Sequence, residues 1–120
     1  MKIRLISTVA SVAALLGMLS SPVAFSAAHG AKIAEGKKVA FDRKKGNCLS
    51  CHAIVSGQAA GNLGPPLIAM KARFPDKAAL RAQIYDATQR NPATPMPPFG
   101  KHNILTDQEI DLVTEFIYSL

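Results

Sequence analysis

The segment Cys48-Leu49-Ser50-Cys51-His52 constrains the fold of this chain more than any other feature, because Cys-x-x-Cys-His is the pattern at which a c-type haem is attached. Two cysteines three residues apart on a helical turn face the same way. Their thiols can therefore add to the two vinyl groups on one edge of a porphyrin. His52 then lies under the iron and supplies an imidazole nitrogen as axial ligand. The motif predicts one covalent haem per chain.

Two other interpretations of the cysteine pair are weaker. A structural zinc site needs about four ligands, and beyond the motif only His29 and His102 remain, with no second pair of cysteines. A thioredoxin-like redox pair needs a βαβ context, and the sequence contains no alternating strand pattern of useful length. Haem attachment is therefore the favoured interpretation.

The N-terminal segment is predicted to be a secretory signal. Lys2 and Arg4 precede an apolar stretch at residues 5–19, which is too short for a membrane span, and small residues suited to cleavage follow. We therefore expect a signal peptide at residues 1–28 and one domain at residues 29–120, with an uncleaved N-terminal anchor as the alternative. Export together with Cys-x-x-Cys-His indicates a bacterial periplasm, with no membrane attachment after cleavage.

The charge of the expected mature chain is unevenly distributed. With Lys2 and Arg4 removed, 12 basic residues stand against 8 acidic ones, a net charge of +4. Residues 32–45 hold six of the basic side chains, whereas residues 106–120 hold four acidic and no basic ones. A basic patch can steer an acidic partner, although a solvated helix face is the default interpretation. Nucleic-acid binding is not expected, because the chain has neither an aromatic platform nor a reading module.

Three segments have helical patterns, at residues 31–44, 76–88 and 107–119. The last is the best defined, because Thr106 with Glu109 three residues on forms a capping box ahead of a broad apolar face. No internal repeat is present. The patterns predict a small all-α fold.

A proline-rich loop at residues 91–100 holds a single methionine, Met96, among four prolines. Proline has few backbone conformations to lose on folding, so this loop can hold one side chain in place. We predict Met96 as the distal iron ligand. Met70, beside an earlier loop, and His102, which would give bis-histidine ligation, are the alternatives. His29 is expected to lie in a disordered N-terminus.

The proximal histidine needs a partner for its second ring nitrogen, because that hydrogen bond fixes the tautomer and the ring orientation. A carbonyl from the loop Gly64-Pro65-Pro66-Leu67 is the natural candidate. Pro65 cannot donate a backbone hydrogen bond, but its carbonyl can accept one. A simple surface turn is the alternative interpretation of this loop.

The order of these features resembles a class I cytochrome c domain: helix, haem motif, Gly-Pro-x-Leu loop, middle helix, methionine loop and C-terminal helix. The resemblance implies that the first and last helices cross, with a glycine and aromatic residues at the contact. Gly36 and Phe41, against Phe116 or Tyr118, would fill those places.

A narrower resemblance is to the sulfur-oxidation cytochrome family SoxX, and it covers essentially the whole expected mature chain. The segments that carry it are residues 46–52, 61–67, 71–76, 80–86, 96–100, 104–106 and 109–110. It implies a heterodimer with a SoxA-type cytochrome that holds the catalytic haem. The pair, an L-cysteine S-thiosulfotransferase, would join thiosulfate to a cysteine of the carrier SoxYZ. This chain would accept the electrons, with His52 and Met96 on its iron, and pass them to a downstream acceptor.

Two other functions remain open. A free-standing periplasmic electron shuttle would use the same haem and differ only in its partner. A haem-based sensor or small haem enzyme would need an open sixth position, against which the Met96 loop argues. For a permanent heterodimer we expect an apolar contact rim beside the Met96 loop, with Phe99 projecting from it. The basic first helix is the alternative contact surface.

Overall fold

The computed structural model describes residues 22–120, and within this range the fold consists of helices and loops. The elements in chain order are α1 (Pro22–Phe41), η1 (Cys48–Ser50), α2 (Met70–Arg73), α3 (Lys77–Tyr85), η2 (Ala87–Gln89) and α4 (Asp107–Tyr118), where η marks a 3₁₀ helix. The described residues form no strand, only an isolated parallel bridge between Ile54 and Leu67. The predicted all-α fold is confirmed.

The first helix starts earlier than the sequence pattern indicated, at Pro22 instead of residue 31. Alanines at four positions between residues 27 and 34 favour this extension, because alanine is the best helix former. His29, expected to be disordered, lies within the helix with its Nδ1 3.9 Å from Glu115 Oε2. The expected boundary after residue 28 also falls inside α1, and residues 1–21 of the expected signal peptide lie outside the described residues. No helix in residues 22–120 is both long enough and apolar enough to cross a bilayer.

The expected helix at residues 76–88 is divided into α3 and η2. Asp76 begins α3 by accepting a hydrogen bond from Ala78 N at 2.9 Å. Asp86, at φ −151° and ψ 87°, leaves the helical region and ends the helix, and its carboxylate then accepts from Thr88 N at the start of η2. Asp86 therefore divides the expected helix in two, because it ends α3 and caps the first turn of η2.

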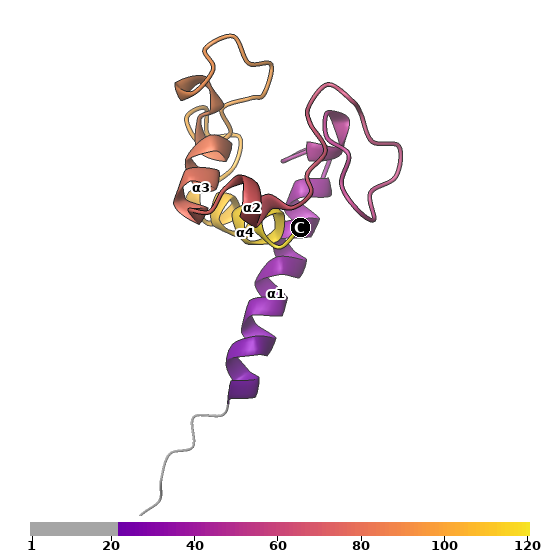
Figure 1. Ribbon diagram of the computed structural model, residues 1–120, viewed down its shortest axis with the longest axis vertical. Coiled ribbons are helices and arrows are strands. Elements are labelled where there is room, and N and C mark those ends of the chain that lie inside the picture. The colour runs from indigo at the N-terminus through magenta and orange to yellow at the C-terminus, as the bar shows by residue number, and fades with distance from the viewer. Residues whose placement is uncertain (1–21) are drawn as a thin grey trace, which may run out of the picture.

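The first and last helices cross at a glycine, as Figure 1 shows where α4 runs across α1. A β-carbon at Gly36 would lie 1.9 Å from the Leu112 carbonyl oxygen, so only glycine permits this approach. Beside it the Phe41 and Phe116 rings meet edge to face, with centroids 5.8 Å apart. The expected Gly36 and Phe41 contact is confirmed with Phe116 as the aromatic partner on α4.

The last helix has the predicted capping box. Thr106 Oγ1 accepts from Glu109 N at 3.2 Å, and Glu109 Oε2 accepts from Thr106 N at 3.0 Å. Its apolar face is buried in the core, which includes Ile110, Val113, Phe116 and Ile117.

The acidic side chains of α4 form ion pairs with basic residues from earlier segments of the chain. Glu109 pairs with Lys45, and Glu115 pairs with Lys77 at 2.6 Å. Arg81 reaches both Asp107, at 3.0 Å, and Asp111, at 2.6 Å. The acidic run is therefore neutralised within the domain and binds the other elements to α4.

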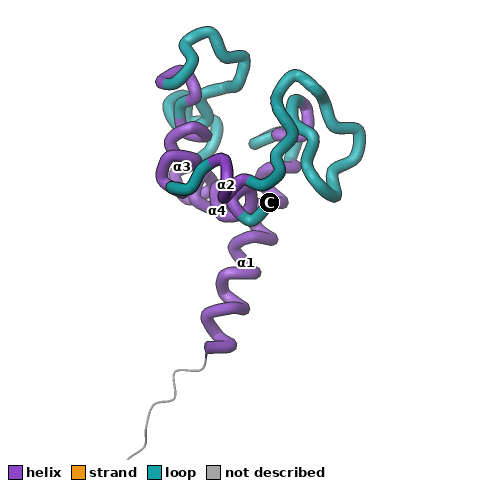
Figure 2. The backbone as a smooth tube through the Cα atoms, in the orientation of Figure 1, coloured by secondary structure: helices purple, strands orange, loops and turns teal. Residues whose placement is uncertain are grey.

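Long loops make up the part of the domain opposite the free end of α1, as the teal segments in Figure 2 show. One joins the haem motif to α2, and the other joins η2 to α4. Their inner surfaces and the helical core enclose the site described next.

Candidate functional site

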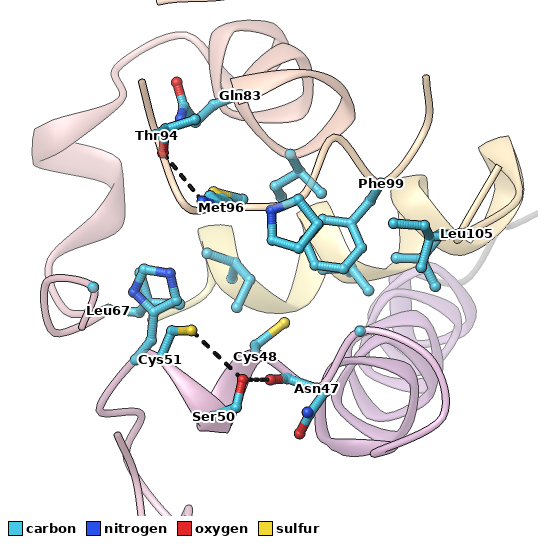
Figure 3. A pocket seen from close by; sticks show the side chains of 18 of the residues that line it. Asn47, Cys48, Ser50, Cys51, Leu67, Gln83, Thr94, Met96, Phe99 and Leu105 are labelled. Atoms are coloured by element: carbon cyan, nitrogen blue, oxygen red, sulfur yellow. Dashed lines mark hydrogen bonds between the residues drawn. The ribbon is translucent and has the colours of Figure 1, made fainter. Parts of the chain in front are cut away.

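A cavity of about 540 Å³ lies between these two loops and the helical core. Its size is within the range of small-molecule and cofactor sites. Figure 3 shows the two cysteines on one side and Met96 on the other. Most of the lining is apolar, and the core contributes side chains that include Leu80, Ile84, Phe99, Leu105, Val113 and Ile117.

The two cysteines reach the cavity from η1, which begins at Cys48, and from Cys51 directly after it. Asn47, in the left-handed region at φ 47°, turns the chain into this helical turn. Cys48 O then accepts from His52 N at 2.9 Å, which places the histidine directly after the turn. Burial raises the pKa of the Cys48 thiol to about 11, so the thiol is uncharged at neutral pH. An uncharged thiol suits an apolar cavity.

The His52 imidazole is held from two sides. Its Nδ1 lies 2.7 Å from the carbonyl oxygen of Pro65. Because a carbonyl can only accept, this hydrogen bond requires a proton on Nδ1 and leaves the lone pair of Nε2 free to bind a metal. Gly64 lies against the ring, where a β-carbon would be 2.4 Å from His52 Cε1. The contact with Pro65 is the one the sequence suggested.

Backbone hydrogen bonds hold the Gly64–Leu67 loop against the haem motif. Gly64 N donates to Cys51 O at 2.8 Å, and Leu67 N donates to Ala53 O at 2.9 Å. Arg73 Nη1 adds a side-chain hydrogen bond to Pro66 O at 2.8 Å. The contact of Gly64 with the imidazole ring and the hydrogen bond from Arg73 were not predicted from the sequence. The glycine before two prolines indicated a turn whose carbonyl could reach the histidine, and the fold adds that Gly64 itself packs against the ring.

Met96 reaches the cavity from the proline-rich loop. Asn91 Oδ1 accepts from Ala93 N at 3.1 Å, and Thr94 Oγ1 accepts from Met96 N at 3.2 Å, so short polar side chains order the loop on either side of the prolines. The second of these bonds is drawn in Figure 3. The thioether is partly buried and lines the cavity on the side away from the cysteines.

The alternative ligands have different surroundings. Met70 is 1% exposed and belongs to the core as well as to the cavity wall, and its sulfur accepts from Arg73 Nη1 at 3.5 Å. His102 is exposed and His29 lies on α1, and neither is among the residues that line the cavity. Among residues 22–120, no three His, Cys, Asp or Glu side chains gather so that they could hold a metal ion.

Phe99 does not project from the methionine loop. It is 8% exposed and packs in the core, where it also lines the cavity. The expectation that Phe99 forms an exposed contact rim was wrong, because the loop turns back onto the core and Ile104 N and Leu105 N both donate to Phe99 O. Leu63 and Ile104 are large hydrophobic side chains that line the cavity and are exposed, at 66% and 42%.

The residues present fit a covalently attached haem c. Two thiols lie on one side of an apolar cavity, a histidine presents its free Nε2, and a thioether lies across from the cysteines. When bound, a haem supplies an iron that can take up and release an electron. The protein supplies the ligand atoms, orients the imidazole and keeps water from the apolar interior.

Fold and site together define a class I, c-type cytochrome domain. Residues 31–117 match the domain family described as cytochrome c oxidase, cbb3-type, subunit III. The chain belongs to this family of cytochrome c domains. Membership supports electron transfer as the function and implies covalently bound haem c.

A comparison with curated proteins finds a similar protein in Aquifex aeolicus (strain VF5), described as an uncharacterized lipoprotein. It is 33% identical over 79 residues, which cover 62% of this chain. The match spans only 37% of the relative's own length, so the similarity concerns a part of that protein and not the whole of it.

Proposed function

We propose that this chain is a single-haem electron carrier whose haem is attached through Cys48 and Cys51 and ligated by His52 and Met96. The observation that carries the proposal is the hydrogen bond between His52 Nδ1 and Pro65 O, which leaves Nε2 free beside the two thiols. Met96 ligation raises the reduction potential relative to a second histidine, as suits a chain that accepts electrons.

Covalent attachment is tested by acid-acetone extraction of the purified holoprotein. The haem should stay with the protein, and the double variant Cys48→Ala, Cys51→Ala should contain none. Release of free haem from the unmutated protein would contradict the proposal.

More narrowly, we propose that the carrier is the SoxX-type subunit of a SoxAX complex in a bacterial periplasm. It would accept electrons while thiosulfate is joined to a cysteine of SoxYZ, and the catalytic haem would belong to the SoxA-type partner. The resemblance of residues 61–67, 71–76 and 96–100 to the SoxX family supports this assignment. Both cysteines of the chain belong to the haem motif, so no further cysteine is present to carry a persulfide. This suits a subunit that transfers electrons and does not itself form the bond to sulfur.

A free-standing electron shuttle is the second candidate, and the burial of Phe99 leaves less exposed apolar surface beside the Met96 loop than a heterodimer was expected to use. A shuttle forms transient contacts and needs less apolar surface than a permanent subunit. Leu63 and Ile104 supply the exposed apolar surface at the cavity on which the heterodimer proposal now depends.

The two candidates are separated by following reduction of this haem in a mixture with a SoxA-type cytochrome, SoxYZ and thiosulfate. The subunit proposal expects reduction only when the SoxA-type partner is present, together with copurification of a larger haem protein from the native host. Equal reduction without that partner would leave the shuttle.

A further inference from the structure

The methionine loop closes on itself at one point of the fold. Tyr85 O, at the end of α3, accepts from Gly100 N at 3.0 Å and from Lys101 N at 3.3 Å. The chain between η2 and residue 100 therefore returns to the place where it left, which is the geometry of an Ω-loop. Met96 lies within this closed segment.

The Asp86 carboxylate binds both ends of the closed loop. On the outgoing side, Oδ1 accepts from Thr88 N at 3.1 Å and Oδ2 accepts from Gln89 Nε2 at 2.9 Å. On the returning side, Lys101 Nζ lies 3.2 Å from Oδ2. Thr88 Oγ1 supplies a further hydrogen bond to Oδ1.

The carboxylate of Asp86 is both buried and ionised. The residue is 6% exposed. The hydrogen bonds from Thr88 and Gln89, followed by that from Lys101, hold the pKa of the Asp86 carboxyl well below its usual range. A buried charge is retained at a site only where donors compensate it, and here those donors come from both ends of one loop.

The prolines stiffen the methionine loop, so the contacts at its two ends fix its position. Four of the ten residues at 91–100 are prolines, which restrict movement inside the loop. Displacement of Met96 then requires the loop to move as a unit about residues 86–89 and 100–101. Loss of the contacts there should loosen the segment between η2 and the buried Phe99 without unfolding the helices.

We propose that Asp86 is a positioning residue that keeps Met96 on the iron by closing the methionine loop. This inference rests on the proposed role of Met96 as distal ligand. Asp86 does not line the cavity, so it acts through the loop and not on the haem.

The test compares holoprotein with Asp86→Asn and Asp76→Asn. Both aspartates cap a helical turn, but Asp76 lies at the opposite end of α3 and contacts Ala78 N. The readouts are the near-infrared sulfur-to-iron band of the oxidised protein, the reduction potential and the affinity for added imidazole. Asp86→Asn should weaken the band, lower the potential and tighten imidazole binding by about tenfold, because the open form becomes more populated. Asp76→Asn should change none of the three.

A second variant covers the case in which Asp86→Asn does not fold. Lys101→Met removes only the ion pair on the returning side and should shift imidazole affinity in the same direction by a smaller factor. Equal imidazole affinities in the wild type, Asp86→Asn and Asp76→Asn would overturn the inference. If Asp86→Asn does not fold, an unchanged affinity in Lys101→Met would overturn it as well. Met96→Ala tests the ligand assignment separately from the role of Asp86. If that variant loses the sulfur-to-iron band while Asp86→Asn has no effect, Met96 is the iron ligand and only the inference about Asp86 fails.

Discussion

Gly36 on α1 lies directly against the backbone of α4, where a β-carbon would stand 1.9 Å from the Leu112 carbonyl oxygen. The backbone oxygen cannot move away without separating the helices. The crossing of the first and last helices therefore depends on the absence of one methyl group. The Phe41 and Phe116 rings pack beside this contact and would separate with it.

We expect Gly36→Ala to destabilise the holoprotein by about 1–3 kcal/mol, the usual cost of overpacking. Chemical denaturation measures the change. Gly30→Ala is the control, because it lies on the same helix with nothing within 4 Å. That variant should be neutral or slightly stabilising, since alanine favours the helix. Equal stabilities of the two variants would contradict the crossing described here.

Gly64→Ala should disturb the proximal histidine. The added methyl group would occupy the space of the His52 ring, and the hydrogen bond to Pro65 would lengthen or break. Loss of the hydrogen-bond partner of a metal-binding histidine usually lowers metal affinity or activity roughly tenfold or more. We expect a changed reduction potential and slower electron transfer by about that factor. Asn62→Ala, at an exposed position of the same loop, should leave both unchanged, and a silent Gly64→Ala would contradict the proposed constraint.

Met96→Ala and Met70→Ala should have opposite effects on the sulfur-to-iron band and on the stability of the fold. The first removes the proposed ligand, so the sulfur-to-iron band should vanish and the iron should bind added ligands. The second empties a core position that is 1% exposed, which usually costs about 2–5 kcal/mol, while the band should stay. Absorption spectra and denaturation curves separate the two effects. Loss of the band only in Met70→Ala would reverse the assignment.

The ion pair of Lys45 with Glu109 should make part of the stability depend on pH. The Lys45 side chain lowers the pKa of the Glu109 carboxyl in the folded protein. A lowered folded pKa gives stability that is present above the unfolded pKa and is lost as the pH falls through the folded value. Lys45→Met should therefore lower the melting temperature at neutral pH, and the difference from the wild type should shrink below about pH 4.

Lys44→Met is the matched control for that measurement. Lys44 is exposed, and no ion pair involves it within residues 22–120. Its substitution should leave the melting temperature unchanged at both pH values. A difference for Lys45→Met that persists undiminished in acid would show that packing, and not the ion pair, links this segment to α4.

Leu63→Glu should weaken binding of the proposed SoxA-type partner. Leu63 is 66% exposed and lines the cavity, so a partner that delivers electrons to the haem at this opening would cover it. Burying a leucine contributes about 1.5–3 kcal/mol, and its replacement should raise the dissociation constant roughly tenfold or more. Val55→Glu is the control, at a 73% exposed apolar position that does not line the cavity. The dissociation constants are measured by titration with the partner, and the haem spectra should be unchanged in both variants. Equal dissociation constants for the two variants would exclude Leu63 from the contact.

Short-range patterns were sufficient to predict the all-α fold and the main helices. The Thr106 and Glu109 capping box depends on a spacing of three residues, and the apolar face of α4 depends on helical periodicity, so both can be predicted locally. The Cys-x-x-Cys-His motif likewise carries its chemistry in five consecutive residues. The assignment of Met96 as ligand is also based on sequence, and the spectroscopic variants above test it.

The tertiary structure decided which segments meet, because burial and long-range contacts depend on how the loops return to the core. Phe99 has the same apolar side chain whether it projects or packs, and only the closed methionine loop buries it. The acidic run of α4 likewise gave no sign of its pairing with Lys45, Lys77 and Arg81. The sequence by itself determined the haem-binding motif and the order of the elements. Their folding together determined how closely Gly64 packs against the His52 ring and which carboxylate closes the loop around Met96.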